Sequence, residues 1–446
     1  MKSLSKFQLI LLIVFGALAI SGVMIFAFAV GGTGGNGVGP VLIWGTQDAT
    51  TFNAVIRQAS ETTPGLSQIS YEQHDPLTYE DDLTNAIASG RGPDLFIIRQ
   101  DYAVKNAGKI YSIPFSSFSQ EQFESTFIEA ANPFVSQNQQ AVLAVPFVAD
   151  PLVLFWNRDL LSAAGYAKPP VYWDEIVGMA TYVTGGSSSV NQNAITRRDD
   201  ANTIKKSALA FGEYQNIVNA KDILATLIMQ AGGTITALDT SNHPIPSLSA
   251  RTGDVQQSSE SALRFYTGFA DPSKNDYSWN RSLPESRAAF AAGDLGLYVG
   301  YASEEALIRR MNPNINFAPA QLPQIRGGNR TLTYAHVYGF AIARGGKNPV
   351  SANTAVYLLV SNAMSKALST VLGMPSARRD VLAQKTVGDN EVYQRSAIIS
   401  RSWIDPDPEK TNDTFRAMIE NTTSGAASVS ETVQRADQEL AHILGL

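Results

Sequence analysis

The sequence predicts an α/β fold built as two lobes and preceded by one transmembrane helix. Three observations support this expectation. Stretches of strand and helix character alternate after position 40, which predicts a parallel sheet with helices on both faces. The expected strands are apolar throughout, as in strands that are covered on both sides. Two apolar strands then meet at a polar break around Asp150, which is how one chain passes between two α/β lobes.

The first element is a candidate membrane segment. Phe7–Val30 contains 24 residues, of which two are clearly polar, and at about 1.5 Å per residue it can span a hydrocarbon core of about 30 Å. Two lysines precede it and the next basic residue is Arg57, which predicts a cytoplasmic N-terminus and a body outside. The alternative is a cleaved signal peptide ending at residues 27–29, although its apolar core usually has about 7–15 residues. We therefore expect an anchor over residues 1–30 and a glycine-rich linker over 31–40.

Strands and helices alternate in the segment that follows the linker. Strands are expected at 41–44, 69–71 and 95–98, and helices at 52–60 and 79–89. In parallel sheets of this kind, ligands bind beyond the carboxyl ends of the strands. The turns after the strands expected at 41–44, 95–98 and 144–148 carry three acidic residues, namely Asp48, Asp101 and Asp150.

The stretch from Ala144 to Trp173 carries the most specific motif. Two apolar strands flank Asp150, and a helix from Leu160 stops at Gly165 before a pair of prolines. This arrangement resembles the hinge of extracytoplasmic solute-binding proteins of ABC importers, in the group similar to maltose-binding protein. The matching positions are Pro146, Asp150, Leu152, Trp156, Asn157, Arg158, Asp159, Leu160, Leu161, Ala164, Gly165, Pro169, Pro170, Trp173, Asp174 and Glu175.

The resemblance covers nearly everything after residue 40. It implies a periplasmic-binding-protein-like fold with three crossings between the lobes, near Asp150, Gly300 and Ala343. The family's ligand-contacting turns fall on Asp48 and Asp101, and its hinge carboxylate falls on Asp150. The expected lobes are residues 41–150 with 300–342 for the first, and 151–299 with 343–446 for the second.

A cleft between two lobes suits sugars. Sugar rings offer C–H faces to aromatic side chains and hydroxyls to carboxylates, amides and arginines, and such buried hydrogen bonds give specificity. Trp279 lies in a polar loop and Trp403 is flanked by charges, so both are expected to stack on a ligand. Trp156 and Trp173 are instead expected in the core. The expected ligand-binding residues are Trp44, Asp48, Asp94, Asp101, Asp150, Tyr214, Asn216, Trp279, Tyr301 and Trp403.

Four of these residues carry an open structural alternative. Trp44 ends an inner strand and could equally belong to the core. Asp94 follows a Gly-Pro pair, where an aspartate is often structural. Tyr214 and Asn216 precede a helix and could equally form a capped loop.

Composition excludes several classes of protein. The chain has no cysteine, which removes disulfides, thiol catalysis, thiolate metal sites and a lipid-modified cysteine. The net charge of −6 argues against nucleic acid as a partner, because phosphates need a basic surface. The four histidines are scattered and show no pair at metal-ligand spacing. We expect no cofactor and no metal.

The sequence therefore predicts a membrane-anchored, extracytoplasmic receptor that delivers an oligosaccharide to the permease subunits of an ABC importer. One alternative is a surface sensor or adhesin that binds glycan without transport. A remote alternative is a glycoside hydrolase, because two carboxylates about 5–10 Å apart can cleave a glycosidic bond. Carboxylates also line clefts that only bind sugars, so we expect a protein that is not an enzyme. Small peptides and polyols remain open as ligands.

Overall fold

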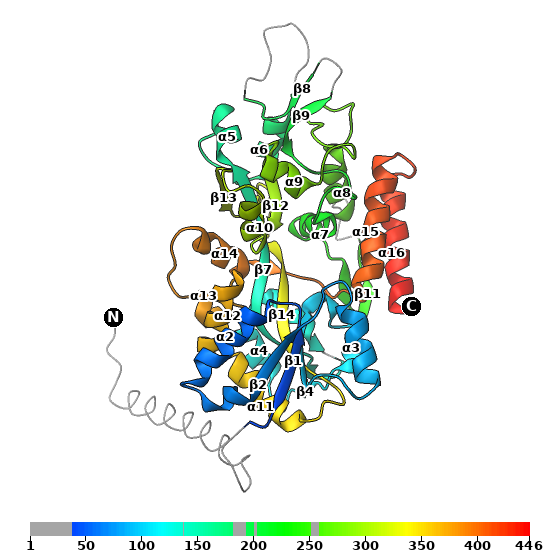
Figure 1. Cartoon of the computed structure of the whole chain (residues 1–446). Coiled ribbons are helices and arrows are strands. Elements are labelled where there is room, and N and C mark those ends of the chain that lie inside the picture. The colour runs from blue at the N-terminus through cyan, green and yellow to red at the C-terminus, as the bar shows by residue number, and fades with distance from the viewer. Residues whose placement is uncertain (1–37, 137, 182–192, 200–202, 251–257) are drawn as a thin grey trace, which may run out of the picture.

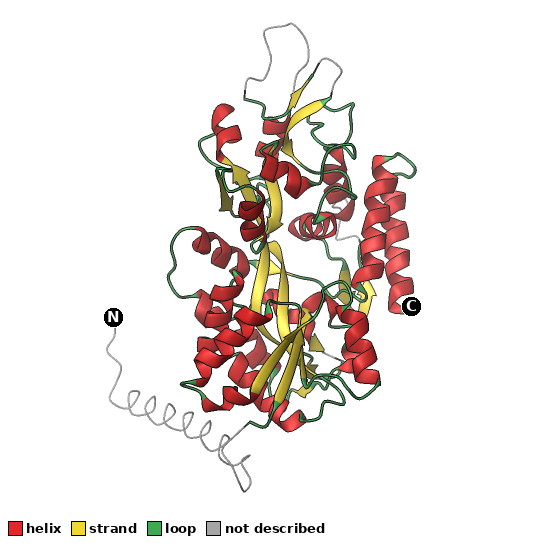
Figure 2. Cartoon of the chain, in the orientation of Figure 1, coloured by secondary structure: helices red, strands yellow, loops and turns green. Residues whose placement is uncertain are grey.

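The computed structural model describes residues 38–136, 138–181, 193–199, 203–250 and 258–446, and these form two lobes (Figures 1 and 2). The expected membrane helix lies outside these residues. Within the part of the chain described, no single helix is both long and apolar enough to cross a bilayer. Helices α11 (Pro349–Leu359) and α12 (Asn362–Leu372) reach that length and composition only as a pair, bent by 73°.

Lobe 1 is built on five strands in the order β2-β1-β3-β14-β7. The first three run parallel, as expected, whereas β14 runs antiparallel to both β3 and β7 because it returns from the other lobe. The rings of Phe52, Phe147 and Phe340 pack together in the core. The elements are β1 Val41–Gly45, α2 Ala49–Ser60, β2 Ile69–Gln73, α3 Tyr79–Ala88, β3 Leu95–Arg99, β4 Ile113–Pro114, α4 Gln120–Thr126, β5 Val135–Ser136, β6 Ala141–Val142, β7 Val145–Asn157, β14 Thr333–Ile342, α11, α12, α13 Arg379–Leu382, α14 Asp389–Ile398 and β15 Ser400–Arg401.

Lobe 2 uses the second half of β7. Residues Leu152–Asn157 of this strand pair antiparallel with β12 and β13, and β12 pairs parallel with β9. Aromatic side chains fill the core, among them Phe211, Tyr266 and Trp279. The elements are α5 Arg158–Ala163, α6 Trp173–Ala180, β8 Arg197–Arg198, β9 Ile204–Leu209, α7 Ala220–Gln230, β10 Thr236–Leu238, β11 Pro244–Pro246, α8 Ser258–Gly268, α9 Ser286–Ala292, β12 Leu295–Tyr301, α10 Glu304–Met311, β13 Phe317–Ala320, α15 Pro408–Thr423 and α16 Val429–Leu444.

Three segments connect the two lobes. Strand β7 passes from one core to the other between Ala149 and Leu152, as expected at Asp150. Strand β14 returns, since Tyr334 packs in the lobe 2 core and Ala335 in the lobe 1 core. The third crossing lies between α14 and Trp403: in α14, Tyr393 packs in the lobe 2 core and Ala397 in the lobe 1 core, and Trp403 then packs in the lobe 2 core.

The second and third crossings differ from the expected positions near Gly300 and Ala343. Gly300 lies in β12 and pairs with Val153 inside lobe 2, so the chain does not leave that lobe there. The lobe boundaries shift accordingly. Residues 300–332 pack with lobe 2 rather than lobe 1, and α11 and α12 pack with lobe 1 rather than lobe 2. The long-range pairing of β12 with β7 causes the difference, and no local pattern in the sequence reports it.

Candidate functional site

A cavity of about 620 Å³ lies between the lobes. Lobe 1 contributes the turn after β3, and lobe 2 contributes the start of α7, the end of β12 and the start of α15. The crossing strands β7 and β14 form part of its wall. Its polar and aromatic lining includes Arg99, Asp101, Tyr102, Asp150, Tyr214, Asn219, Lys221, Asp222, Arg287, Tyr301, Ser303, Glu304, His336, Tyr338, Glu409 and Asn412. We refer to this cavity as the cleft.

Four of the ten expected site residues line the cleft together, namely Asp101, Asp150, Tyr214 and Tyr301. They come from four separate regions of the chain. Asp101 follows β3 at its carboxyl end, which is where parallel strands present ligand contacts. Asp150 lies on the first crossing, so it stands between the two lobes.

Asp101 is held by a neighbouring arginine. Arg99 donates from Nε to Oδ1 at 3.0 Å and from its terminal nitrogen to Oδ2 at 2.5 Å. Burial alone would raise the pKa of Asp101, but the positive charge of Arg99 and those of more distant cations lower it to about 2. The carboxylate is therefore ionised at neutral pH and fixed in a two-pronged ion pair.

Asp150 has a different environment. Its two oxygens accept hydrogen bonds from the backbone N–H of Ser303 at 3.0 Å and from the Ser303 hydroxyl at 2.6 Å. Burial raises the pKa of Asp150 to about 7, although these hydrogen bonds act in the opposite direction. The bond to Ser303 also ties the first crossing to the turn that starts α10.

Tyr301, His336 and Asp222 contact one another beside the crossing strand β14. The Tyr301 ring stacks on His336 with centroids 4.6 Å apart, and its hydroxyl donates to Asp222 at 2.6 Å. Nε2 of His336 lies 3.5 Å from the same Asp222 oxygen. Burial, followed by the charge of Arg99, lowers the pKa of His336 to about 4, so the imidazole is neutral at pH 7.

Lys221, in the first turn of α7, is fully occupied by hydrogen bonds. Its ammonium donates to Asp405 at 2.7 Å, to the Thr411 hydroxyl at 2.7 Å and to the Pro408 carbonyl at 3.3 Å. Burial raises the pKa of Asp405 to about 6 despite this positive neighbour. The network fixes α7 against the start of α15, and both elements line the cleft.

Two further sets of contacts involve α15, which lines the cleft. Tyr214 donates from its hydroxyl to Asn412 at 2.5 Å, and the guanidinium of Arg416 lies 5.2 Å from its ring centroid. Across the gap, Lys105 of lobe 1 pairs with Glu409 of lobe 2 at 2.8 Å. The two lobes are therefore in direct polar contact beside the cleft.

Three expected site residues have structural roles in lobe 1 instead. Asp48 is the exposed N-cap of α2 and accepts from the Thr51 N–H at 2.8 Å. Asp94 is buried at the opposite end of β3 from the cleft, where its oxygens accept backbone N–H bonds from Leu42 and Asn348. Trp44 lies at the end of β1, where it packs on His74 at 4.0 Å and donates to Glu72. None of the three lines the cleft.

Asn216 and Trp279 have structural roles in lobe 2. Asn216 is buried and donates to the carbonyls of Asn280 and Leu283, so it fixes the loop before α9. Trp279 was expected to stack on a ligand, but only 1% of it is exposed and it packs in the lobe 2 core. Its backbone N–H donates to Phe269 at 3.1 Å, which draws the polar loop inward.

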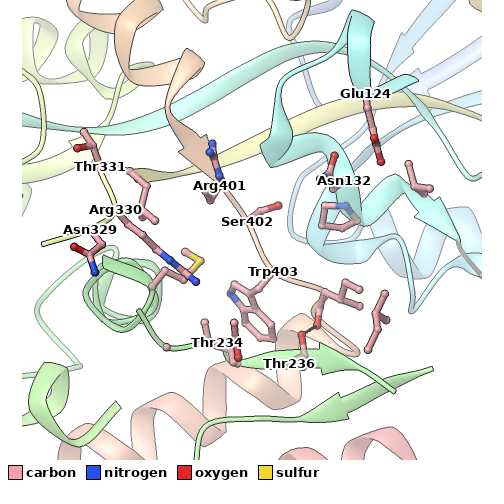
Figure 3. Close-up of a pocket in the computed structure, with 18 residues that line it drawn as sticks. Glu124, Asn132, Thr234, Thr236, Asn329, Arg330, Thr331, Arg401, Ser402 and Trp403 are labelled. Carbon is pink, nitrogen blue, oxygen red and sulfur yellow. Dashed lines mark hydrogen bonds between the residues drawn. The ribbon is translucent and has the colours of Figure 1, made fainter. Parts of the chain in front are cut away.

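Trp403 lies in a second inter-lobe cavity of about 600 Å³, shown in Figure 3. The third crossing forms one side of it, Glu124 and Asn132 come from lobe 1, and Thr234 comes from lobe 2. Trp403 is 5% exposed and packs on Phe415. It does not line the cleft, so stacking on a ligand held in the cleft is not supported by its position.

Several cleft residues were not singled out from the sequence. Arg99 could have been found because it is two positions from Asp101, and Asp222 because it opens the helix that the resemblance places at the cleft. His336 gives no local signal, since only the register of β14 against β7 brings it opposite Asp150. The main residues missed are Arg99, Lys221, Asp222, Arg287, Glu304 and His336.

No group of three or more histidine, aspartate or glutamate side chains within the described ranges could hold a metal ion. The charged groups of the cleft are held by ion pairs or by hydrogen bonds to neutral side chains on neighbouring helices and strands. This arrangement can offer fixed donors, acceptors and aromatic faces to a solute held between the lobes.

Comparison with known proteins identifies the family to which this chain belongs. The two lobes, the three crossings and the cleft between them are features of a solute-binding protein. The sequence pattern of the bacterial extracellular solute-binding proteins matches residues 54–394. The chain belongs to this family.

Individual relatives are distant. A maltotriose-binding protein of Pyrococcus abyssi is 27% identical over 143 residues, which are 31% of this chain and 30% of that protein. The matches to curated relatives thus span well under half of their length, 38% in the first of them.

Solved structures share the fold over nearly the whole chain. The cyclic α-maltosyl-1,6-maltose binding protein of Arthrobacter globiformis has a TM-score of 0.71 at 17% identity, covering 91% of this chain and 99% of that one. A cyclo/maltodextrin-binding protein complexed with maltotetraose has a TM-score of 0.69 at 14% identity, with coverage of 92% and 98%. At this identity, the similarity establishes the fold.

Proposed function

We propose that this protein is an extracytoplasmic receptor that binds a carbohydrate in the cleft and delivers it to the permease subunits of an ABC importer. The observation that carries the proposal is the lining of the cleft, which combines carboxylates, amides, arginines and four tyrosines from both lobes and the crossings. Sugars need this combination, because their hydroxyls pair with fixed polar groups and their C–H faces with aromatic rings. Relatives of this fold include proteins named for maltodextrins and maltotriose.

The mechanism follows from the position of the site. A ligand that touches Asp101 and Tyr102 in lobe 1 and Tyr214 in lobe 2 gains contacts only when both lobes approach it. The closed form is then favoured by this difference in binding free energy between the two states. Bending is concentrated at the three crossings. The ATPase activity that drives import belongs to other chains.

We further propose ligand contacts for Asp101, Asp150, Tyr214 and Tyr301, and a membrane anchor over residues 1–30 with the binding lobes outside the cytoplasm. The lining of the cleft supports the contacts, and membership of an extracellular family supports the location. A sensor or adhesin would bind in the same way but would not dock on a permease. Co-purification with the permease subunits separates these two functions.

Thermal unfolding with a panel of mono- and oligosaccharides, polyols and short peptides tests the proposal. A ligand at 100 times its Kd should stabilise the protein by about 2.7 kcal/mol. We expect one sugar class to raise the Tm, and Tyr102→Ala to abolish the effect. Tyr111→Ala is the matched control, because Tyr111 is exposed beside the far end of β14. A panel that gives no shift with any sugar would refute a carbohydrate receptor.

A further inference from the structure

The cationic side chains that line the cleft are already paired. Arg99 forms its two-pronged ion pair with Asp101. Arg287 pairs with Glu304 at 3.2 Å. The three hydrogen-bond donors of the Lys221 ammonium all have acceptors within lobe 2. Each of these cations therefore already has a counter-charge within the protein, and an anionic ligand would add a further negative charge beside it.

Two carboxylates in the cleft have only neutral partners. Asp150 accepts both of its hydrogen bonds from Ser303. Asp222 accepts from the Tyr301 hydroxyl, and its other neighbour is the neutral imidazole of His336. Within the described part of the chain, neither carboxylate forms an ion pair with a lysine or an arginine.

These two carboxylates belong to the same part of the cleft. His336 stands opposite Asp150 in the register of β14 against β7, and its ring nitrogen lies 3.5 Å from Asp222. The Asp222 side chain is 15% exposed, so a solute can reach it. Tyr301 and Tyr338, which also line the cleft, offer aromatic surface nearby.

We propose that the cleft selects a hydroxyl-rich ligand that carries a positive charge, such as a protonated amino sugar, with its cation beside Asp222 and Asp150. This inference rests on the proposed function and adds the charge class of the ligand. Closing the lobes withdraws both side chains from water, where ionising a carboxyl group without a counter-charge is costly. A cationic ligand supplies that counter-charge, whereas an anionic ligand adds a repulsion.

The test compares three forms of one sugar by calorimetry at low ionic strength, namely glucosamine, glucose and glucuronate. We expect glucosamine to bind at least about tenfold more tightly than glucuronate, with glucose between them. Asp222→Asn keeps the shape of the side chain and should reduce this ratio to near one. Glu439→Gln is the matched control, because it removes an exposed negative charge on α16 and should leave the ratio unchanged.

A second measurement needs no variant and so does not depend on how Asp222→Asn folds. Added salt should weaken the binding of glucosamine to the unmodified protein and leave glucose unaffected. Equal binding of all three sugars, tighter binding of glucuronate, or failure of glucosamine where glucose binds would overturn the charge preference and leave the carbohydrate receptor standing. Absence of binding by every sugar in the panel would refute the receptor, and this inference with it.

Discussion

The two ends of strand β3 carry buried aspartates that differ in what surrounds them. Asp94 precedes the strand and accepts two backbone N–H bonds, so it joins β1 to the turn before α11. Asp101 follows the strand and faces a cavity between the lobes, where an arginine holds it. Both are under 10% exposed. Burial alone therefore does not distinguish an aspartate inside lobe 1 from one that lines the cleft, whereas their positions and partners do.

Substitution of the buried Trp279 should have the largest effect on stability. Trp279 is enclosed in the lobe 2 core, so Trp279→Ala should lower the free energy of unfolding by about 3–5 kcal/mol. Chemical denaturation measures this loss. Sugar binding by the folded fraction should survive. A variant that kept full stability and lost binding would reverse the assignment of Trp279 to the core.

Asp94→Ala should give the next largest effect. It leaves the N–H groups of Leu42 and Asn348 without their acceptor, and each is part-buried. We expect a loss of about 2 kcal/mol in the free energy of unfolding, with unchanged ligand affinity. Asp94→Asn retains one acceptor oxygen and should lose less. Reduced affinity in both variants at normal stability would place Asp94 in the ligand site.

Asp101→Asn should show the opposite pattern. The variant weakens the two-pronged ion pair with Arg99, whose side chain is 32% exposed and can turn toward water. We expect a smaller loss of stability than in Asp94→Ala and about a tenfold loss of ligand affinity, which corresponds to about 1.4 kcal/mol. Calorimetric titration at pH 7 measures the affinity. Unchanged affinity would mean that Asp101, like Asp94, is structural.

Asp150→Asn tests the burial of this carboxyl group through the pH dependence of stability. The folded protein holds a proton on Asp150 up to about pH 7, whereas the unfolded chain releases it near 3.8. Ionisation of Asp150 therefore lowers stability as pH rises through this window. Relative to the unmodified protein, the variant should gain stability by about 1 kcal/mol per pH unit between pH 4 and 7. A difference that does not change with pH would contradict the burial of an uncompensated carboxylate.

The lowered pKa of His336 has the opposite effect on stability over a similar pH range. Its pKa is lowered from 6.5 to about 4, so the unfolded chain binds a proton that the folded protein does not. Stability therefore rises with pH between these values and is lost as pH falls. In the unmodified protein the two groups offset each other. The comparison with Asp150→Asn isolates the carboxylate because His336 is present in both proteins.

The sequence was informative where a feature is local. The first crossing, the hinge carboxylate Asp150 and the turn at Asp101 were predicted because an apolar strand that ends in a polar turn can be recognised along the chain. Trp279 was misassigned because its neighbours in sequence are polar, whereas its burial depends on the backbone hydrogen bond to Phe269 and on packing in the lobe 2 core. The return crossing was misplaced because β12 and β14 are both apolar strands, and only their pairing with β7 tells them apart.

The chain passes back and forth between the two lobes, and this limits the order in which the lobes can fold. Lobe 1 lacks β14 and four of its helices until residue 398 has been made, by which point most of lobe 2 already exists. Lobe 2 in turn waits for α15 and α16 at the end of the chain. Domains normally fold as they emerge from the ribosome, but here neither lobe is complete until nearly the whole chain has been synthesised.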